Sequence, residues 1–279
     1  MTTATTELVR PLLALGNNPL GPTLTLARRR FQLSARTPRD LIVPLLTPIL
    51  FALVIAPALK DALHTTSAYE SFVATGTIGL LIPLNTMFAG IGVLVDRESG
   101  AQRELLTAPI SRALLVLANL VVAFAITALQ IAVLLIVARA RGIHFDVTAS
   151  GLFWFLGAGA LFTIGMYGAA EILAARMPST EEYVGRVPVI AIVPWFLAGS
   201  LFPITALPAF LAWFARFLPL THALALVRWG LLGDSAGLHD IWQLQDTTAM
   251  ASLSLGVVAL FAVLLTTVAI RVFSRRAVS

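Results

Sequence analysis

The chain has 279 residues, of which 58% are hydrophobic and 12% are charged, against about 25% charged residues in an ordinary soluble domain. A soluble fold of this length cannot bury so much apolar surface, so the composition indicates that lipid is the solvent for much of the chain. The absence of cysteine excludes disulfides and thiolate metal sites. The net charge of +5 does not indicate a nucleic-acid partner, because the basic residues flank apolar runs instead of forming one stripe.

The N-terminal region combines a tail with a basic amphipathic segment. Residues 1–23 lack the apolar core and cleavage site of a signal peptide, and we expect a tail there. Residues 24–40 mix apolar side chains with arginines, which is typical of a helix lying in the inner membrane interface. The basic residues of this predicted interfacial helix are Arg28, Arg29, Arg30, Arg36 and Arg39. Arginines near anionic headgroups contribute about 1 kcal/mol each, but a simple topology anchor explains the same pattern.

Six apolar runs are candidates for crossing the bilayer. A helix rises about 1.5 Å per residue against a hydrocarbon core about 30 Å thick, and in lipid each span must satisfy its own backbone groups, which favours helices. The predicted spans are residues 41–59, 72–95, 113–138, 147–175, 187–202 and 247–270. Pro44, Pro48 and Pro57 predict a bend or a late start in the first span, and Pro188 and Pro194 predict that the fifth is short or broken.

Residues 205–232 are apolar enough for a seventh span, but Arg216, His222 and Arg228 interrupt them. The distribution of basic residues arbitrates, because cytoplasmic loops carry an excess of Lys and Arg. With six spans and both termini in the cytoplasm, the outer side of the cell membrane holds only five basic residues, namely Lys60, Arg139, Arg141, Arg216 and Arg228. A seventh span would place the C-terminal arginines outside. We therefore expect residues 205–232 to form a re-entrant helical hairpin at the outer face, before the last span.

A compact charged segment, residues 96–112, separates the second and third spans. We expect a helix over residues 97–106, which ends before Pro109 because the residue preceding a proline avoids the helical region. Within that helix no opposite charges stand three or four residues apart, so we expect the charges to be available to something outside it. Lipid headgroups explain the arginines, whereas Glu98 and Glu104 gain nothing beside an anionic leaflet.

The motif Asp96-Arg97-Glu98-x-Gly100, followed by Arg103-x-Leu105-Leu106-x-x-Pro109-Ile110-Ser111-Arg112, resembles the cytoplasmic loop of type-2 ATP-binding-cassette (ABC) exporter permeases. The nearest branch is the drug-resistance branch that includes daunorubicin exporters. The resemblance covers residues 24–276 as one transmembrane domain. It implies that this coupling loop holds a coupling helix seated in a cleft of a nucleotide-binding subunit. The residues that it assigns to this contact are Arg97, Glu98, Gly100, Arg103, Glu104, Leu105 and Pro109.

The chain offers no nucleotide site of its own. A P-loop needs a glycine-rich loop ending in Lys, and Lys60, the only lysine, has no glycine near it. The resemblance therefore implies a permease that is not an enzyme, with ATP and Mg²⁺ bound by a separate cytoplasmic ABC ATPase in two copies. It also implies a second permease subunit, identical or related, and efflux of a hydrophobic drug, antibiotic or lipid.

Polar residues inside the predicted spans are further candidates, namely Glu171, Asn85, Asn119 and Gln130. A carboxylate at the bilayer centre costs about 2.5–3.5 kcal/mol, so Glu171 needs a partner, and Arg176 and Arg186 are nearest by topology. We interpret it as a paired acid near the inner interface in preference to a proton relay. The three amides are expected to bond across helices, which contributes about 0.6 kcal/mol on average.

Two alternatives belong to other functional classes. An ion-coupled secondary transporter would need paired acids at mid-membrane, where the sequence offers only Glu171. A lipid-modifying membrane enzyme would need a cluster of His, Asp or Glu at one interface. The four histidines show no metal-binding spacing, so no metal site is predicted.

Overall fold

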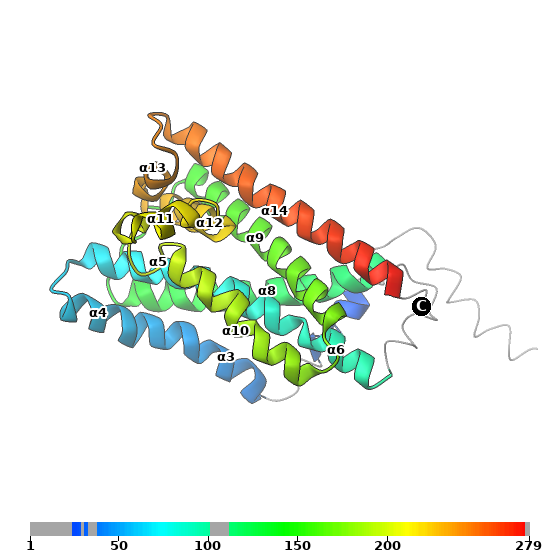
Figure 1. Ribbon diagram of the computed structural model, residues 1–279. Coiled ribbons are helices and arrows are strands. Elements are labelled where there is room, and N and C mark those ends of the chain that lie inside the picture. Colours follow the sequence, from blue (N-terminus) through cyan, green and yellow to red (C-terminus); the bar gives the residue numbers. More distant parts are fainter. Residues whose placement is uncertain (1–23, 29–30, 33–37, 101–111, 277–279) are drawn as a thin grey trace, which may run out of the picture.

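The computed structural model describes residues 24–28, 31–32, 38–100 and 112–276. Every regular element in those ranges is helical, which confirms the predicted all-α class. Figure 1 shows the long helices lying side by side, with short helices gathered at one end and the C-terminus at the other. We call these the α13 end, after α13 (Ala236–Trp242), and the α6 end, after α6 (Ile91–Glu98).

Five helical stretches are long and apolar enough to cross a bilayer. They are Pro44–Ala62, Ser67–Glu98, Val116–Ala140, Ala149–Arg176 and Thr247–Val272. They correspond to the first, second, third, fourth and sixth predicted spans. A bent helix pair near the α13 end would be a further span if it crosses as one unit. The chain is therefore a multi-pass membrane protein with five to six apolar spans.

The first span is not a uniform α-helix. It consists of α3 (Pro38–Leu50), a π-helical turn (Phe51–Ile55) and α4 (Ala56–Ala62). The π turn ends two residues before Pro57, which has no N–H to donate to the carbonyl of Leu53, so the wider turn lies where the α-helical ladder is interrupted. The prolines thus alter the hydrogen-bonding pattern without ending the helix.

The next three spans are close to their predicted positions. The second consists of α5 (Ser67–Ala89) and α6, which meet at Gly90. The third is α8 (Arg112–Ala140), and the fourth is α9 (Ala149–Arg176), whose N-cap Thr148 accepts a hydrogen bond from the N–H of Gly151. The last span is α14 (Thr247–Arg276).

The fifth predicted span differs most from the structure. Its helix, α10 (Thr180–Leu197), begins before the predicted start at residue 187, and residue 202 lies beyond its end. Pro188 and Pro194 both lie inside it, so the expected break is absent. The first two turns carry Glu181, Glu182 and Arg186, and this stretch is not among the apolar candidates. In Figure 1, α10 nevertheless runs alongside α5 from the α6 end towards the α13 end.

The predicted hairpin over residues 205–232 contains two helices joined at a bend of 77°. They are α11 (Ala209–Ala215) and α12 (Pro219–Leu232), preceded by a 3₁₀ turn, Ile204–Ala206. The bend coincides with Pro219, which begins α12. Most of α12 is buried, and α13 follows it as a short helix that the sequence reasoning did not foresee.

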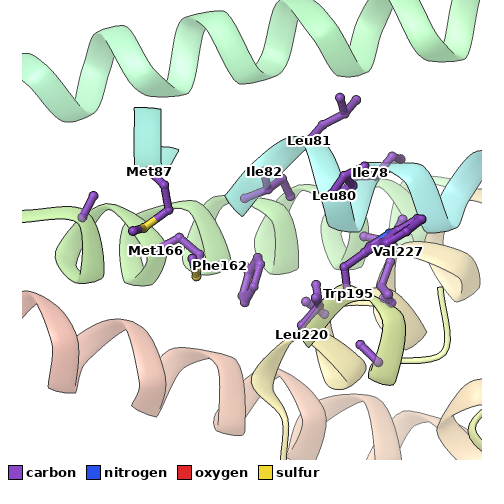
Figure 2. Packing of buried hydrophobic residues seen from close by; sticks show 14 of the residues in the cluster. Ile78, Leu80, Leu81, Ile82, Met87, Phe162, Met166, Trp195, Leu220 and Val227 are labelled. Carbon is purple, nitrogen blue, oxygen red and sulfur yellow. The ribbon is translucent and has the colours of Figure 1, made fainter. Parts of the chain in front are cut away.

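The main core lies where α5, α9, α10 and α12 meet. Figure 2 shows side chains from these helices converging, among them Ile78 and Met87 of α5, Phe162 of α9, Trp195 of α10 and Val227 of α12. Because lipid is as apolar as leucine, such helices associate through van der Waals packing and hydrogen bonds. Close packing along α5 is therefore what positions the polar groups described below.

Two glycines of α9 let α14 approach closely. A Cβ on Gly165 would overlap the ring of Phe261, and one on Gly168 would lie 2.8 Å from the backbone of Leu265. Small residues at helix contacts are a common device in membranes, because they let backbones come together. Helices α9 and α14 therefore form a tightly packed pair along one side of the bundle.

The predicted interfacial helix is only partly described. Residues 24–28 and 31–32 are helical, Arg28 is exposed, and Ala27 packs against Ala118 and Val122 of α8. Arg29, Arg30 and Arg36 lie outside the described residues. Arg39 lies in the first turn of α3, so the helix that carries the first span begins before the predicted boundary at residue 40.

Candidate functional site

The α6 end holds the described part of the predicted coupling loop. Helix α6 ends at Glu98, and Gly100 has a φ of +78°, a left-handed conformation that stops a helix and that glycine adopts without strain. The expected helix from residue 97 is therefore wrong at its start, because Arg97 and Glu98 complete the helix of the second span. Arg103, Glu104, Leu105 and Pro109 lie outside the described residues.

Arg97 binds the end of α9. Its Nη1 donates to the carbonyl oxygen of Ala174 at 3.2 Å, and its Nη2 donates to those of Met177 and Pro178 at 2.6 and 3.3 Å. The last carbonyls of a helix have no partner within it and carry its negative dipole end. A guanidinium is suited to this position, because its several N–H donors reach separate carbonyls in one plane. Arg97 thus caps α9 and the connection to α10.

Glu98 binds the start of α10. Its Oε1 accepts hydrogen bonds from the backbone N–H of Thr180 at 2.9 Å and from the Thr180 hydroxyl at 3.0 Å. The N-cap residue of α10, Ser179, satisfies another donor by accepting from the N–H of Glu182. A carboxylate is favourable here, because the N-terminus of a helix carries a partial positive charge.

These contacts correct one expectation. Arg97 and Glu98 were expected to offer their charges to another molecule, but both side chains bind segment 174–180 of the same chain. The sequence argument failed because it searched only neighbours three and four residues apart, whereas the partners are 77–82 residues away. The contact of Arg97, Glu98 and Gly100 with an ATPase stays a prediction.

A second polar cluster lies deeper, between α9 and α10. Glu171 is buried and accepts a hydrogen bond from the hydroxyl of Tyr167, one turn earlier. The neighbouring Tyr183 is fully buried and donates to the carbonyl oxygen of Met87 at 2.6 Å. Arg186, one of the two partners expected for Glu171, pairs with Glu182 on the surface.

The predicted amide bonds across helices are confirmed for one pair. Nδ2 of Asn85 in α5 donates to Oε1 of Gln130 in α8 across 2.6 Å, and Gln130 is buried. Asn119 also lies in α8, outside this pair. The amides therefore join two spans and point to packing, as expected for such groups.

Sequence reasoning missed an ion cluster at the α13 end. Glu70, at the start of α5, is buried and lies 3.3 Å from both Lys60 and Arg141. The cluster ties α4 to α5 and to the residues that follow α8. The available signal was an acid two residues before the predicted second span, with two of the predicted outer basic residues, Lys60 and Arg141, as possible partners.

Arg228 of α12 is buried in the same half of the molecule. Its guanidinium carbon lies 3.5 Å from the centroid of the Phe72 ring, and Nη2 donates to the carbonyl oxygen of Ser200 at 3.1 Å. A cavity of about 40 Å³ lies beside it, with Asp234 and Asp240 in its lining. The cation is thus held by an aromatic face and a carbonyl, and two acids lie close by.

One larger cavity, of about 190 Å³, opens between α8 and α9. Its lining is apolar except for Thr127 and Thr163. Within the described residues no group of three or more His, Asp or Glu side chains is arranged to hold a metal ion. The site therefore consists of side chains that bind helix termini, namely Arg97 and Glu98, and of apolar surfaces.

The long apolar helices, joined at the α6 end by the contacts of Arg97 and Glu98, define a polytopic α-helical membrane protein. The family described as ABC-2 type transporter matches residues 22–232, which include both sides of the charged segment 96–112. This chain belongs to that family. A relative named "Putative transport permease ycf38", from Porphyra purpurea, is 24% identical over 190 residues, which cover 68% of this chain and 65% of the relative. The chain thus spans less than two thirds of that relative, and the drug-resistance branch stays a prediction.

Proposed function

We propose that the chain is the permease subunit of an ATP-driven exporter in the cell membrane. Two permease subunits, identical or related, enclose the translocation path, and two copies of a cytoplasmic ABC ATPase bind ATP and Mg²⁺. Each ATPase contacts segment 96–112 of a permease. The cargo is a hydrophobic drug, antibiotic or lipid. The observation on which this proposal depends is the family match. The matched residues include four of the candidate spans, the bent helix pair α11–α12 and the charged segment 96–112.

The arrangement of charge supports the proposed orientation, in which the α6 end faces the cytoplasm and the α13 end faces outward. The end of α6, the start of α8, the α9–α10 connection and the C-terminal end of α14 lie at one end of the bundle (Figure 1). The basic residues of that end outnumber those at the α13 end, as the positive-inside rule requires of the cytoplasmic side. At the α13 end Glu70 pairs with Lys60 and Arg141, which leaves that end still less basic.

The apolar surfaces support a hydrophobic cargo. The cavity between α8 and α9 is lined almost wholly by aliphatic and aromatic side chains. The side of α10 away from the core exposes Val189, Val193 and Phe196. Such surfaces suit acyl chains and aromatic rings, and offer no set of charges that would select an ionic cargo.

Co-purification and ATP turnover test the proposal. The permease is expressed with a soluble ABC ATPase encoded beside it, and the purified complex is assayed in lipid nanodiscs. We expect a stable complex and an ATP turnover that Arg103→Glu lowers by at least about tenfold, since a like-charge contact at an interface costs several kcal/mol and each 1.4 kcal/mol is a factor of about ten. Arg103 is preferred to Glu98 for this test because Glu98 also caps α10.

The matched control is Arg139→Glu, which reverses an exposed basic residue at the α13 end and should leave turnover unchanged. Equal turnover in both variants would contradict the proposed contact. Uptake driven by an ion gradient without any ATPase would favour a secondary transporter instead. Cargo is then sought by ATP-dependent movement of hydrophobic dyes and labelled lipids in proteoliposomes.

A further inference from the structure

The end of α6 is joined to two other helices by two consecutive side chains. Arg97 donates hydrogen bonds to three carbonyl oxygens of segment 174–178, and Glu98 accepts two hydrogen bonds from Thr180. The segment that follows Glu98 is the one proposed to bind the ATPase. Three helix termini, the end of α6, the end of α9 and the start of α10, therefore meet at the base of that segment.

The charges at this junction match the groups that they bind. A guanidinium faces orphan carbonyls at a helix C-terminus, and a carboxylate faces orphan N–H groups at a helix N-terminus. Hydrogen bonds with one ionised partner are shorter and stronger than neutral ones, which makes the junction resistant to small displacements. It is therefore suited to carry force between segments that are far apart in the sequence.

Helix α10 is bound to α5 at two further levels. The hydroxyl of Tyr183 donates to the carbonyl oxygen of Met87, and Nε1 of Trp195 donates to that of Gly76 at 2.8 Å. Helices α5, α6 and α10 are thus joined along most of the bundle. The opposite side of α10 carries exposed apolar residues, including Val189 and Val193, so its movement changes a surface that faces away from the core.

We propose that Arg97 and Glu98 are positioning residues that transmit movement of segment 99–112 to α10. Helices α6 and α10 then move together during the transport cycle, and α10 is a moving wall of the path. This inference rests on the proposed function, in which segment 96–112 binds the ATPase. The competing possibility is that movement passes only through the covalent neighbours of the segment, α6 and α8.

Substituting Thr180 removes the hydrogen bonds between Glu98 and α10 without changing any residue assigned to the ATPase contact. Thr180→Pro removes both donors to Glu98, while proline is well tolerated as the first residue of a helix. The preceding residue, Ser179, has φ −136° and ψ 160°, a conformation that a following proline permits. Thr180→Val is the milder variant, because it removes the hydroxyl and keeps the N–H.

The movement is measured with spin labels on an otherwise cysteine-free chain. Val184→Cys on α10 and Val268→Cys on α14 are exposed positions on two different helices. The labelled permease is diluted with unlabelled permease in the ATPase complex, so that distances within one subunit dominate. Distances are recorded by pulsed electron paramagnetic resonance without nucleotide and with ATP plus vanadate.

We expect a nucleotide-dependent shift of the distance in the otherwise wild-type complex and in the control Glu181→Ala, which removes an exposed acid from the same helical turn. The shift should fall at least twofold in Thr180→Pro, and by less in Thr180→Val. A full shift in both Thr180 variants, or no shift in a wild-type complex that hydrolyses ATP, overturns the inference. Failure of any ABC ATPase to associate with the wild-type permease refutes the proposed function itself, which is a distinguishable result.

Discussion

Trp195 donates its indole N–H to the carbonyl oxygen of Gly76 across 2.8 Å, deep between α10 and α5. The lack of a side chain at Gly76 also makes room for Ser200, whose carbonyl oxygen would overlap a Cβ at that position. The same carbonyl accepts from Arg228. One glycine therefore allows α5, the end of α10 and α12 to come together near the α13 end.

Gly76→Ala should destabilise the protein by about 1–3 kcal/mol, because the new methyl group meets backbone that must move. The expected result is a lower midpoint of thermal unfolding in detergent or nanodiscs. Gly159→Ala is the control, since a Cβ at Gly159 meets nothing within 4 Å. Equal midpoints for the two variants would show that the contact at Ser200 relaxes freely.

The bond between Asn85 and Gln130 is suited to a double-mutant cycle. Asn85→Ala and Gln130→Ala should each destabilise the permease, and the double variant should be more stable than additivity predicts, by about 0.6 kcal/mol. Unfolding by denaturant in mixed micelles gives the free energies. Strict additivity would mean that the bond contributes nothing beyond the packing of each side chain.

Glu70→Gln should lower stability by about 1–3 kcal/mol, because it removes a buried charge that pairs with Lys60 and Arg141. The matched variant is Asp61→Asn, which also neutralises an acid near Lys60 but whose side chain is 77% exposed. Exposed ion pairs contribute little, so this variant should stay within about 0.5 kcal/mol of the wild type. A larger loss of stability in Asp61→Asn than in Glu70→Gln would contradict the conclusion that Glu70 is the stabilising acid of this cluster.

Asp240 in α13 provides a test of pH dependence. Burial raises the pKa of its carboxyl above the ordinary 3.8, and the nearby Arg216 lowers the pKa without cancelling this effect. The folded protein therefore binds this proton more tightly than the unfolded chain, so Asp240 favours folding at low pH. That contribution is lost as the pH rises through the raised pKa.

Asp240→Asn should accordingly raise the unfolding midpoint at neutral pH, and this advantage should shrink as the pH falls towards 3.8. Thermal unfolding between about pH 4 and pH 8 measures the difference. Asp146→Asn, at an exposed acid in the loop before α9, is the control. An advantage of Asp240→Asn that grows on acidification would contradict the sign.

The proposed orientation predicts which loops are accessible from each side of the membrane. The chain has no cysteine, so Thr65→Cys, between α4 and α5, and Ser111→Cys, in the charged segment, report on single sites. An impermeant maleimide should label Thr65→Cys in intact cells and Ser111→Cys only after the membrane is opened. Labelling of Ser111→Cys from outside would invert the topology and remove the ATPase contact.

Local information predicted most of the helices. A span in lipid must satisfy its backbone groups within itself, so a long apolar run already specifies a helix without knowledge of its neighbours. The first, second, third, fourth and sixth spans were identified in this way. The bounds of α10 were not, because its first turns are polar and its start is set by caps from Ser179 and Glu98, the second of which comes from another helix.

The sequence by itself determined that this is a helical membrane protein, where its apolar spans lie, and that a charged segment separates the second from the third. Its family resemblance also pointed to the family that the comparison confirms. Only the tertiary structure decided what the charges contact: Arg97 and Glu98 bind residues 77–82 positions away, and Arg228 lies on Phe72. The reason is that a side chain shows its residue type in the sequence, whereas its partner is selected by how the helices pack.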